Sequence, residues 1–462
     1  MSSTNNKIFS SSSSKYASSR ANSTSQMNAK PAEVILSSSL AAIKVPPKKH
    51  LYAGLNSDDK ARVSVSQAFM HSPEQFLYKY RIQRIIGFGS NGVVIAATAS
   101  DNGSAVAIKI IYKPRVSTKV SPNPLEIEVL KSLDDPILLK YVESWQDENH
   151  FYLVTELFGS DWLSSEPAEN LPPIVFNVRF GGLSSRISLP FSAGSSDLWA
   201  WAYAHRIHIW EVSHHEHTML PIRVIKKIVK QVALSLAVIH SRGFYHGDIK
   251  LENILVQSGG LSDPEIRLAD FGHSKHVSYG IDSYGTQEMS PPEFLRGSPY
   301  GGANRDGRAS DIFALGMLMI MLLNEKNQLP KAAEKIASGS IGYEQLAAVN
   351  SGFYPLDPLE DISFEGLLLL NGMCMVDPAR RITAEQLLSG QSSSGIIMFG
   401  LFTHILNAQY VIFFWSRDRT SGSDNSKLKN TITNVEKIEF AARLHVVTGV
   451  GDYKEKLDLI YA

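Results

Sequence analysis

Residues 244–253 read Phe-Tyr-His-Gly-Asp-Ile-Lys-Leu-Glu-Asn, and this stretch decides the fold. Asp248 and Asn253 place a carboxylate and an amide oxygen five positions apart on one predicted loop. A carboxylate can accept a proton from a hydroxyl, and an amide oxygen can help to hold Mg²⁺. Asp248 suits the first task and Asn253 the second. A His-x-Asp triplet alone is weak evidence, because both residues are common in turns, so the flanking motifs carry the argument.

A glycine-rich turn lies upstream of this loop, with Gly87, Gly89 and Gly92 in the pattern G-x-G-x-x-G. Glycine lets a backbone come close to phosphates. A dinucleotide-binding turn would lead directly into a helix, whereas residues 93–99 read as a strand. The order strand, glycine turn and strand therefore argues against a dinucleotide-binding turn. The next apolar strand ends at Lys109, in the sequence Val-Ala-Ile-Lys.

Three further motifs follow the loop. Asp270-Phe271-Gly272 comes directly after a predicted strand, residues 285–293 read Gly-Thr-Gln-Glu-Met-Ser-Pro-Pro-Glu, and residues 377–382 read Asp-Pro-Ala-Arg-Arg-Ile. Together with the glycine turn and Val-Ala-Ile-Lys, they resemble the eukaryotic protein kinase family over roughly residues 78–391. The resemblance implies an α+β, bilobal protein-kinase fold, with a small β-rich N-lobe and a larger, mainly helical C-lobe.

The resemblance also implies a role for each matched residue. Asp248 orients the acceptor hydroxyl and takes its proton, Lys250 neutralises charge on the transferred group, and Asn253 with Asp270 holds Mg²⁺. The implied ATP-binding residues are Gly87, Gly89, Gly92, Val94, Ala107, Lys109, Glu126, Thr155, Glu156, Phe158, Asp161 and Leu255.

The carboxylate partner of Lys109 has two candidates. Glu126 and Glu128 both lie on the helix expected at residues 124–133. They are two positions apart, so they face different sides of that helix. Alignment with the family favours Glu126 as the partner of Lys109.

Other matched residues have structural roles by resemblance. Asp311 is expected to support the catalytic loop, and Arg381 to pair with Glu293 at the end of the 285–293 segment. A column of apolar contacts is expected from Leu130, Tyr141, His246 and Phe271.

Gly247 is the most informative departure, because most members of the family have arginine there. That arginine pairs with a phosphate on the activation segment. Without it, phosphorylation of Ser278, Ser283 or Tyr284 lacks its usual partner, so we predict that activity does not require phosphate in this segment. Lys250 is typical of serine/threonine kinases within the family.

Four segments make up the expected domain organisation. Residues 1–70 are Ser-rich without sustained apolar periodicity, which predicts a disordered arm. The kinase-like domain covers 78–391, and order is expected from about Phe76. A Pro/Gly/Ser-rich insertion at about 163–196 is expected to lack regular structure or to serve as an interaction loop. Residues 392–462 form a C-terminal tail without a recognised motif.

The insertion leaves the ribose-binding residue open. Asp161 precedes the insertion, and Asp197 follows it at the start of a predicted helix. Either could contact the ribose. In the tail, residues 395–415 carry no charged side chain and are long enough to span a bilayer. His404, Asn407 and Gln409 weaken that reading, and a helix docked on the kinase-like domain or a mispredicted tail is favoured instead.

Composition excludes several classes of protein. The 462 residues contain 45 Lys+Arg and 45 Asp+Glu, a formal net charge of zero that argues against nucleic-acid binding. Cys374 is the single cysteine, so an intrachain disulfide is impossible. A reducing location, in the cytoplasm or nucleus, is expected.

The sequence therefore predicts an ATP- and Mg²⁺-dependent kinase that phosphorylates serine and threonine on protein substrates. A pseudokinase scaffold, which binds partners without catalysis, is the first alternative. A small-molecule phosphotransferase is the second, and residues 285–293 argue against it because such enzymes usually lack this peptide-binding segment. Oligomeric state, pathway and substrate motif do not follow from the sequence.

Overall fold

The structure is a computed structural model that describes part of the 462-residue chain. The described residues are 33–36, 52, 54–113, 123–162, 171–192, 195–214, 218–257, 263–295, 297–300, 305–324, 327, 329 and 362–389. The apolar stretch 395–415 and the rest of the tail lie outside them. Within these residues, no helix has the length and apolar character needed to cross a membrane.

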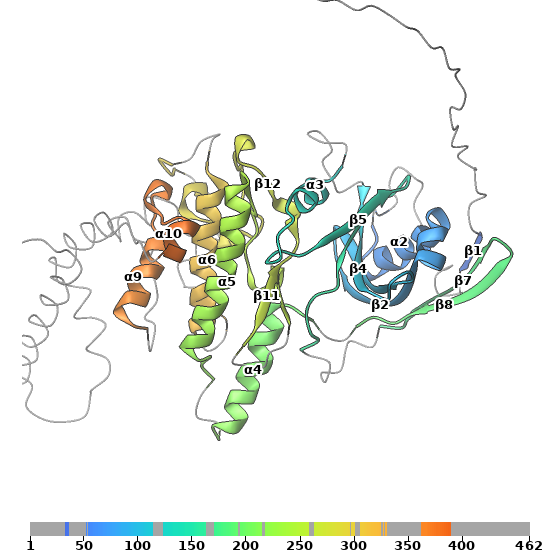
Figure 1. Ribbon diagram of the computed structural model, residues 1–462, viewed down its shortest axis with the longest axis horizontal. Helices are drawn as coiled ribbons and strands as arrows, with labels where there is room; N and C mark the ends of the chain where they lie inside the picture. The colour runs from blue at the N-terminus through green and yellow to red at the C-terminus, as the bar shows by residue number, and fades with distance from the viewer. Residues whose placement is uncertain are drawn as a thin grey trace, which may run out of the picture.

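The smaller lobe is built on one antiparallel sheet with the strand order β2-β3-β4-β6-β5. The strands are β2 (Tyr80–Phe88), β3 (Gly92–Ala99), β4 (Ala105–Tyr112), β5 (Tyr141–Gln146) and β6 (His150–Glu156). Side chains alternate between the two faces of a strand. Val106, Ile108 and Ile110 therefore enter the core on one face of β4, while Ala107 and Lys109 belong to the opposite face. Helix α3 (Leu125–Ser132) lies beside the sheet (Figure 1).

An extra layer covers the apolar face of this sheet. It consists of helix α2 (Ser57–His71) and a three-stranded sheet ordered β1-β7-β8. Phe69 of α2 is fully buried, with its ring centroid 5.1 Å from that of Phe76 and 5.2 Å from that of Phe176 on β7. The prediction of disorder to residue 70, with order starting near Phe76, is wrong for β1 (Glu33–Leu36) and α2.

The insertion is also structured where it is described. Residues 174–189 form a hairpin of β7 (Ile174–Phe180) and β8 (Leu183–Leu189), and β7 pairs on its other side with β1. The expectation of a loop without regular structure is wrong for these residues. Alternating burial along β7 fits a strand with one face on a core. Figure 1 shows this hairpin extending from the smaller lobe beside α2.

The larger lobe is mainly helical and occupies the other half of Figure 1. Its helices are α4 (Leu198–Val212), α5 (Ile222–Ser241), α6 (Gly307–Leu323), α9 (Phe364–Met373) and α10 (Ala384–Ser389). Two short antiparallel pairs accompany them, β10 (Ile254–Gln257) with β11 (Glu265–Leu268) and β9 (Phe244–Tyr245) with β12 (Lys275–His276). The expected bilobal α+β organisation is confirmed.

Two helices position the central loop. The apolar residues of α5 recur at three and four positions, so that one stripe, including Ile225, Val232 and Ile239, is buried. Helix α6 is buried on nearly all sides and begins at the N-cap Asp306, whose carboxylate accepts from the Arg308 amide. The loop after β9 runs between these two helices.

Candidate active site

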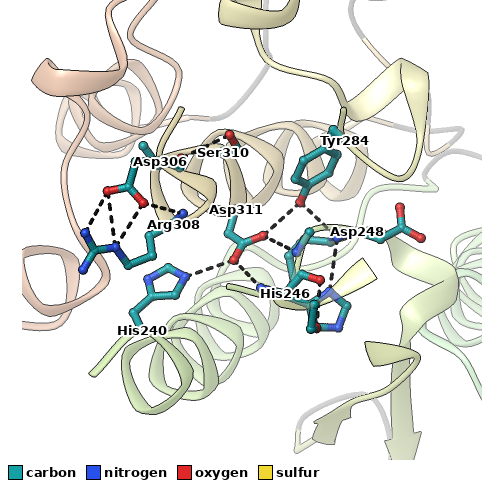
Figure 2. A network of polar contacts seen from close by, with 12 residues as sticks. His240, His246, Asp248, Tyr284, Asp306, Arg308, Ser310 and Asp311 are labelled. Carbon is teal, nitrogen blue, oxygen red and sulfur yellow. Dashed lines mark hydrogen bonds and ion pairs between the residues drawn. The ribbon is translucent and has the colours of Figure 1, made fainter. Parts of the chain in front are cut away.

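The loop at residues 246–248 is held by one buried carboxylate. Asp311 on α6 has no exposed surface and accepts hydrogen bonds from the backbone amides of His246 (2.7 Å) and Gly247 (2.8 Å). His240 Nε2, at the end of α5, lies 3.0 Å from the same carboxylate. Figure 2 shows Asp311 at the centre of this network. The predicted support of the loop by Asp311 is confirmed.

The His246 side chain holds the next part of the loop. Its Nε2 lies 3.1 Å from the Ala269 carbonyl, and its Nδ1 accepts from the Asp248 amide at 3.3 Å. Burial lowers the pKa of the His246 imidazole, which favours the neutral ring that one donor and one acceptor nitrogen require. The His246 ring lies 4.9 Å from that of Phe271 between centroids, as expected for the predicted apolar column.

Asp248 lies at the centre of a cluster of donors. Its Oδ1 accepts from Thr286 Oγ1 at 2.6 Å, and its Oδ2 accepts from Asn253 Nδ2 at 2.9 Å. Lys250 Nζ lies 3.0 Å from Oδ2 and donates to Thr286 Oγ1 at 2.9 Å. The structure thus brings together the three residues predicted to be catalytic, and it adds the hydroxyl of Thr286.

Lys109 joins the two lobes electrostatically. Its Nζ lies 2.6 Å from Glu126 on α3 and 2.8 Å from Asp270. Burial disfavours the Lys109 charge, but the two carboxylates outweigh burial and raise the pKa of this ammonium above its ordinary value. Lys109 in turn holds the pKa of Asp270 well below its usual range. Burial raises the pKa of Glu126, whose side chain is 7% exposed.

Glu126 is confirmed as the carboxylate that pairs with Lys109. Glu128 instead accepts a hydrogen bond from Asn123 Nδ2 at 2.6 Å. The helical spacing separates the two carboxylates, because residues two positions apart point about 200° apart around the axis. Glu126 therefore faces Lys109 and Glu128 does not.

Asn253 and Asp270 suit a divalent cation by their chemistry. The Asn253 amide nitrogen donates to the Asp248 carbonyl (2.8 Å) and carboxylate, and no described residue donates to the Asn253 side-chain oxygen. Asp270 has the left-handed backbone angles φ 58° and ψ 69°, and its carboxylate is half exposed. Carboxylate and amide oxygens are the ligands that Mg²⁺ prefers.

The three glycines of the glycine-rich turn differ in how much space the surrounding structure leaves for a side chain. A Cβ at Gly92 would lie 2.4 Å from the Ile110 carbonyl, so the sheet itself demands glycine there. A Cβ at Gly89 would meet nothing within 4 Å, and one at Gly87 would make only ordinary contact with Val94. Packing therefore does not explain Gly87 and Gly89, and their close approach to phosphates stays a prediction.

The other predicted nucleotide contacts lie on or beside strands of both lobes. Val94 on β3 lies opposite Lys109, and Ala107 on β4 lies opposite Thr155 on β6. Leu255 on β10 forms an isolated bridge with Asp197. Thr155 and Phe158 are buried, and Glu156 is half-buried.

The two ribose candidates have different environments. Asp197 is the N-cap of α4: its Oδ1 accepts from the Ala200 amide at 2.8 Å and its Oδ2 from Ser195 Oγ at 2.5 Å. Burial raises the pKa of the Asp197 carboxyl. Asp161 is exposed and accepts one long bond, 3.4 Å, from Ser192. Asp197 is thus committed to the helix start, and Asp161 is the carboxylate available to a ligand.

The segment after Asp270 ends in a buried ion pair. Glu293 and Arg381 lie against each other with about 1% of each side chain exposed, and Arg381 Nη1 lies 2.7 Å from Glu293 Oε1. The predicted pair is confirmed. Arg381 also donates to the Met375, Ala309 and Val376 carbonyls, at 2.7, 3.1 and 3.5 Å, which gives each of the remaining three guanidinium protons an acceptor.

Two residues near the site had no predicted role in it. Tyr284, considered above only for phosphorylation, is buried against the loop, and its hydroxyl lies 3.3 Å from Asp311. Phe191, in the insertion, contacts the Phe88 ring of the glycine-rich turn, with centroids 5.2 Å apart. Nothing in the sequence marks Phe191, since its contact depends on the path of the insertion.

Known proteins resemble this chain in sequence. A family model described as "Protein kinase domain" matches residues 80–170 and 200–391. Calcium-dependent protein kinase 4 of Plasmodium berghei is 26% identical over 396 residues, which cover 84% of this chain and 60% of that protein. Calcium-dependent protein kinase 4 of Plasmodium falciparum is 26% identical, covering 72% of this chain and 53% of that protein.

A third relative is serine/threonine-protein kinase cds1 of Schizosaccharomyces pombe, 26% identical over 67% of this chain and 57% of that protein. The chain thus spans only about half to three fifths of the length of these relatives. The family match leaves out residues 171–199, which include the β7–β8 hairpin. Because the match on both sides of that gap covers more than half of the chain and contains the site described above, the chain belongs to the protein kinase family.

Proposed function

We propose that this protein is an active serine/threonine kinase that transfers the γ-phosphoryl group of ATP to protein hydroxyls. One observation carries the proposal: the Asp248 carboxylate lies within hydrogen-bonding distance of Thr286, Lys250 and Asn253 at once. A substrate hydroxyl in this position would meet an acceptor for its proton, and the Lys250 ammonium would offset charge on the transferred group. Positioning and electrostatics of this kind provide most of the catalysis in phosphoryl transfer.

The residues on the other side of the cleft would bind the nucleotide. Lys109, held by Glu126, would contact phosphates beneath the glycine-rich turn. Asn253 and Asp270 would hold Mg²⁺, which supplies charge neutralisation on the phosphates when bound. We assign the ribose contact to Asp161, because both carboxylate oxygens of Asp197 are occupied.

Transfer of radiolabelled phosphate by the full chain to a mixed Ser, Thr and Tyr peptide array tests the proposal. Asp248→Asn should lower transfer by about 10²- to 10⁴-fold, the usual loss on removal of a general base. Asp101→Asn, the same change at an exposed turn residue, should leave transfer unchanged. Label on serine and threonine that disappears with Asp248→Asn supports the proposal. ATP binding by folded protein without any transfer would instead favour a scaffold.

A further inference from the structure

The activation segment, the stretch from Asp270 to Glu293, contacts the catalytic loop (residues 246–253) through three consecutive residues, Tyr284, Gly285 and Thr286. The Tyr284 hydroxyl accepts from the Ile249 amide at 2.9 Å and donates to Asp311 Oδ1 at 3.3 Å. The next residue, Gly285, donates its amide to the Gly247 carbonyl at 2.9 Å. Figure 2 shows the Tyr284 hydroxyl directed at the same carboxylate that holds the loop.

Thr286 follows directly and bonds to Asp248 and Lys250. Only Gly285 separates Thr286 from Tyr284 in the chain. The position of the Thr286 side chain therefore depends on where Tyr284 is held. A further link runs in the opposite direction: Tyr245, from the loop side, donates to the Gly280 carbonyl at 2.7 Å. All of these contacts use neutral hydroxyl or backbone groups of the segment.

At Gly247 the catalytic loop has no side chain that could bind the activation segment. The backbone there has φ +81°, and a Cβ would lie 2.7 Å from the His273 carbonyl. A side chain would therefore be strained as well as crowded. Contact with the loop backbone beside Gly247 therefore comes from the segment, through the Tyr284 hydroxyl on the Ile249 amide and the Gly285 amide on the Gly247 carbonyl.

The properties of Tyr284 fit a permanent contact. The residue is 6% exposed, and burial together with the nearby Asp311 carboxylate raises the pKa of its phenol well above the ordinary value. The hydroxyl therefore keeps its proton and can donate to Asp311. Its burial also removes Tyr284 from the candidate phosphorylation sites of this conformation.

We propose that Tyr284 is a positioning residue whose hydroxyl fastens the activation segment to the catalytic loop and places Thr286 beside Asp248 without a phosphate. The proposal deepens the kinase function proposed above and rests on it for its catalytic consequence. Its structural consequence, protection of the segment, is independent of catalysis.

Hydrogen exchange on the full chain tests the structural consequence. Tyr284→Phe removes one oxygen and keeps the ring, so amides in residues 277–289 should exchange about ten-fold faster, as loss of one hydrogen bond to a charged group predicts. Tyr279→Phe is the matched control, because Tyr279 lies in the same segment and is 54% exposed. Exchange in Tyr284→Phe that equals wild type would overturn the proposal, whether or not the chain is a kinase.

Steady-state kinetics test the catalytic consequence. Tyr284→Phe should lower kcat by about ten-fold while KM for ATP stays within about two-fold, because the hydroxyl acts on Thr286 and not on the nucleotide side. Tyr279→Phe should match wild type. A rise in KM for ATP with unchanged kcat would contradict a positioning role at Asp248. If no variant or wild-type chain transfers phosphate, the kinase proposal fails while the exchange result still decides the role of Tyr284.

A variant without the exposed serines of the segment provides a test that does not depend on whether Tyr284→Phe folds. Ser278→Ala combined with Ser283→Ala removes both exposed serine hydroxyls of residues 277–289. This double variant should keep wild-type protection of residues 277–289 and at least about half of the wild-type rate. Loss of segment protection, or of transfer by more than about ten-fold, would show that the segment needs a phosphate and would overturn the proposal.

Discussion

The ring of Phe191 packs edge-on against the ring of Phe88, with their centroids 5.2 Å apart. Backbone hydrogen bonds from Ile85 to the Pro190 carbonyl (2.9 Å) and from Ser192 to the Ile85 carbonyl (2.7 Å) fix the segment on either side of Phe191. The insertion therefore runs along the edge strand β2 and touches the glycine-rich turn. On its other side the Phe191 ring lies 5.2 Å from the guanidinium carbon of Arg62 on α2.

This contact predicts that Phe191→Ala weakens ATP binding. Loss of an aromatic pair costs about 0.5–1.5 kcal/mol, so KM for ATP should rise by roughly two- to ten-fold if the turn loses its position. Phe180→Ala, in the same insertion but in contact with Tyr78, is the matched control. The measurement is KM for ATP at saturating peptide. An equal rise in both variants would indicate general loosening of the hairpin.

The ion pair of Lys109 predicts that two glutamates on α3 differ in their effect on kcat/KM. Glu126→Gln removes a carboxylate 2.6 Å from Lys109 Nζ and should lower kcat/KM by about a hundred-fold, because a small misplacement of a binding group has effects of this size. Glu128→Gln makes the same change on the same helix and should alter kcat/KM by less than about two-fold. Comparable losses in both variants would contradict the assignment.

The helix α2 predicts that part of the N-terminal region is needed for stability. Phe69→Ala empties a fully buried site and should lower the free energy of unfolding by about 3–5 kcal/mol. Val212→Ala, at the end of α4, removes apolar atoms from a residue that is 62% exposed. This control should change the free energy of unfolding by less than about 0.5 kcal/mol. Urea unfolding of the full chain measures both. A Phe69→Ala protein as stable as wild type would show that α2 does not pack on the sheet.

Asp147 predicts a pH-dependent contribution to stability. Burial opposes its charge, but hydrogen bonds from His150, Tyr152 and Asn149 outweigh burial and lower the pKa of the Asp147 carboxyl from 3.8 to about 2. A carboxyl with a lowered folded-state pKa stabilises above its unfolded pKa and loses that contribution as pH falls through the folded pKa. The difference corresponds to about 2 kcal/mol at neutral pH.

Asp147→Asn should therefore be less stable than wild type by about 2 kcal/mol near neutral pH, and the gap should shrink by about half when the pH falls to about 3. Asp101→Asn, at an exposed turn, controls for loss of a charge. Unfolding free energies of the three proteins across this range provide the measurement. A gap that stays constant with pH would mean that Asp147 acts through packing alone.

Local sequence was sufficient for much of the site. Asp248, Lys250 and Asn253 lie within one short loop, so their mutual distances are set largely by the backbone between them. Lys109 with Glu126 and Arg381 with Glu293 are long-range pairs, yet each follows from a motif whose neighbours identify it. Choosing Glu126 over Glu128 needed alignment with the family, because the helical period shows only that the two carboxylates face different sides of the helix.

The prediction of disorder for residues 1–70 failed at α2, because burial along this helix does not follow the helical period. Helix α2 lies between two sheets, so Lys60, Arg62, Ser64 and Ser66 are buried along with its apolar residues. No apolar stripe is then visible in its sequence. Start signals were present, since Asn56 caps the helix and Asp58 and Asp59 occupy the first turn, but they are weak without periodicity.

The sequence by itself determined the family, the bilobal fold and the chemistry of the loop, because these depend on residues close together in the chain or on recognisable motifs. Only the tertiary structure decided that α2 and the insertion form a layer over the small lobe, that Phe191 touches Phe88, and that Tyr284 reaches Asp311. These contacts join segments that carry no shared pattern. Their physical reason is burial of apolar surface and satisfaction of buried polar groups, which depend on where distant segments meet.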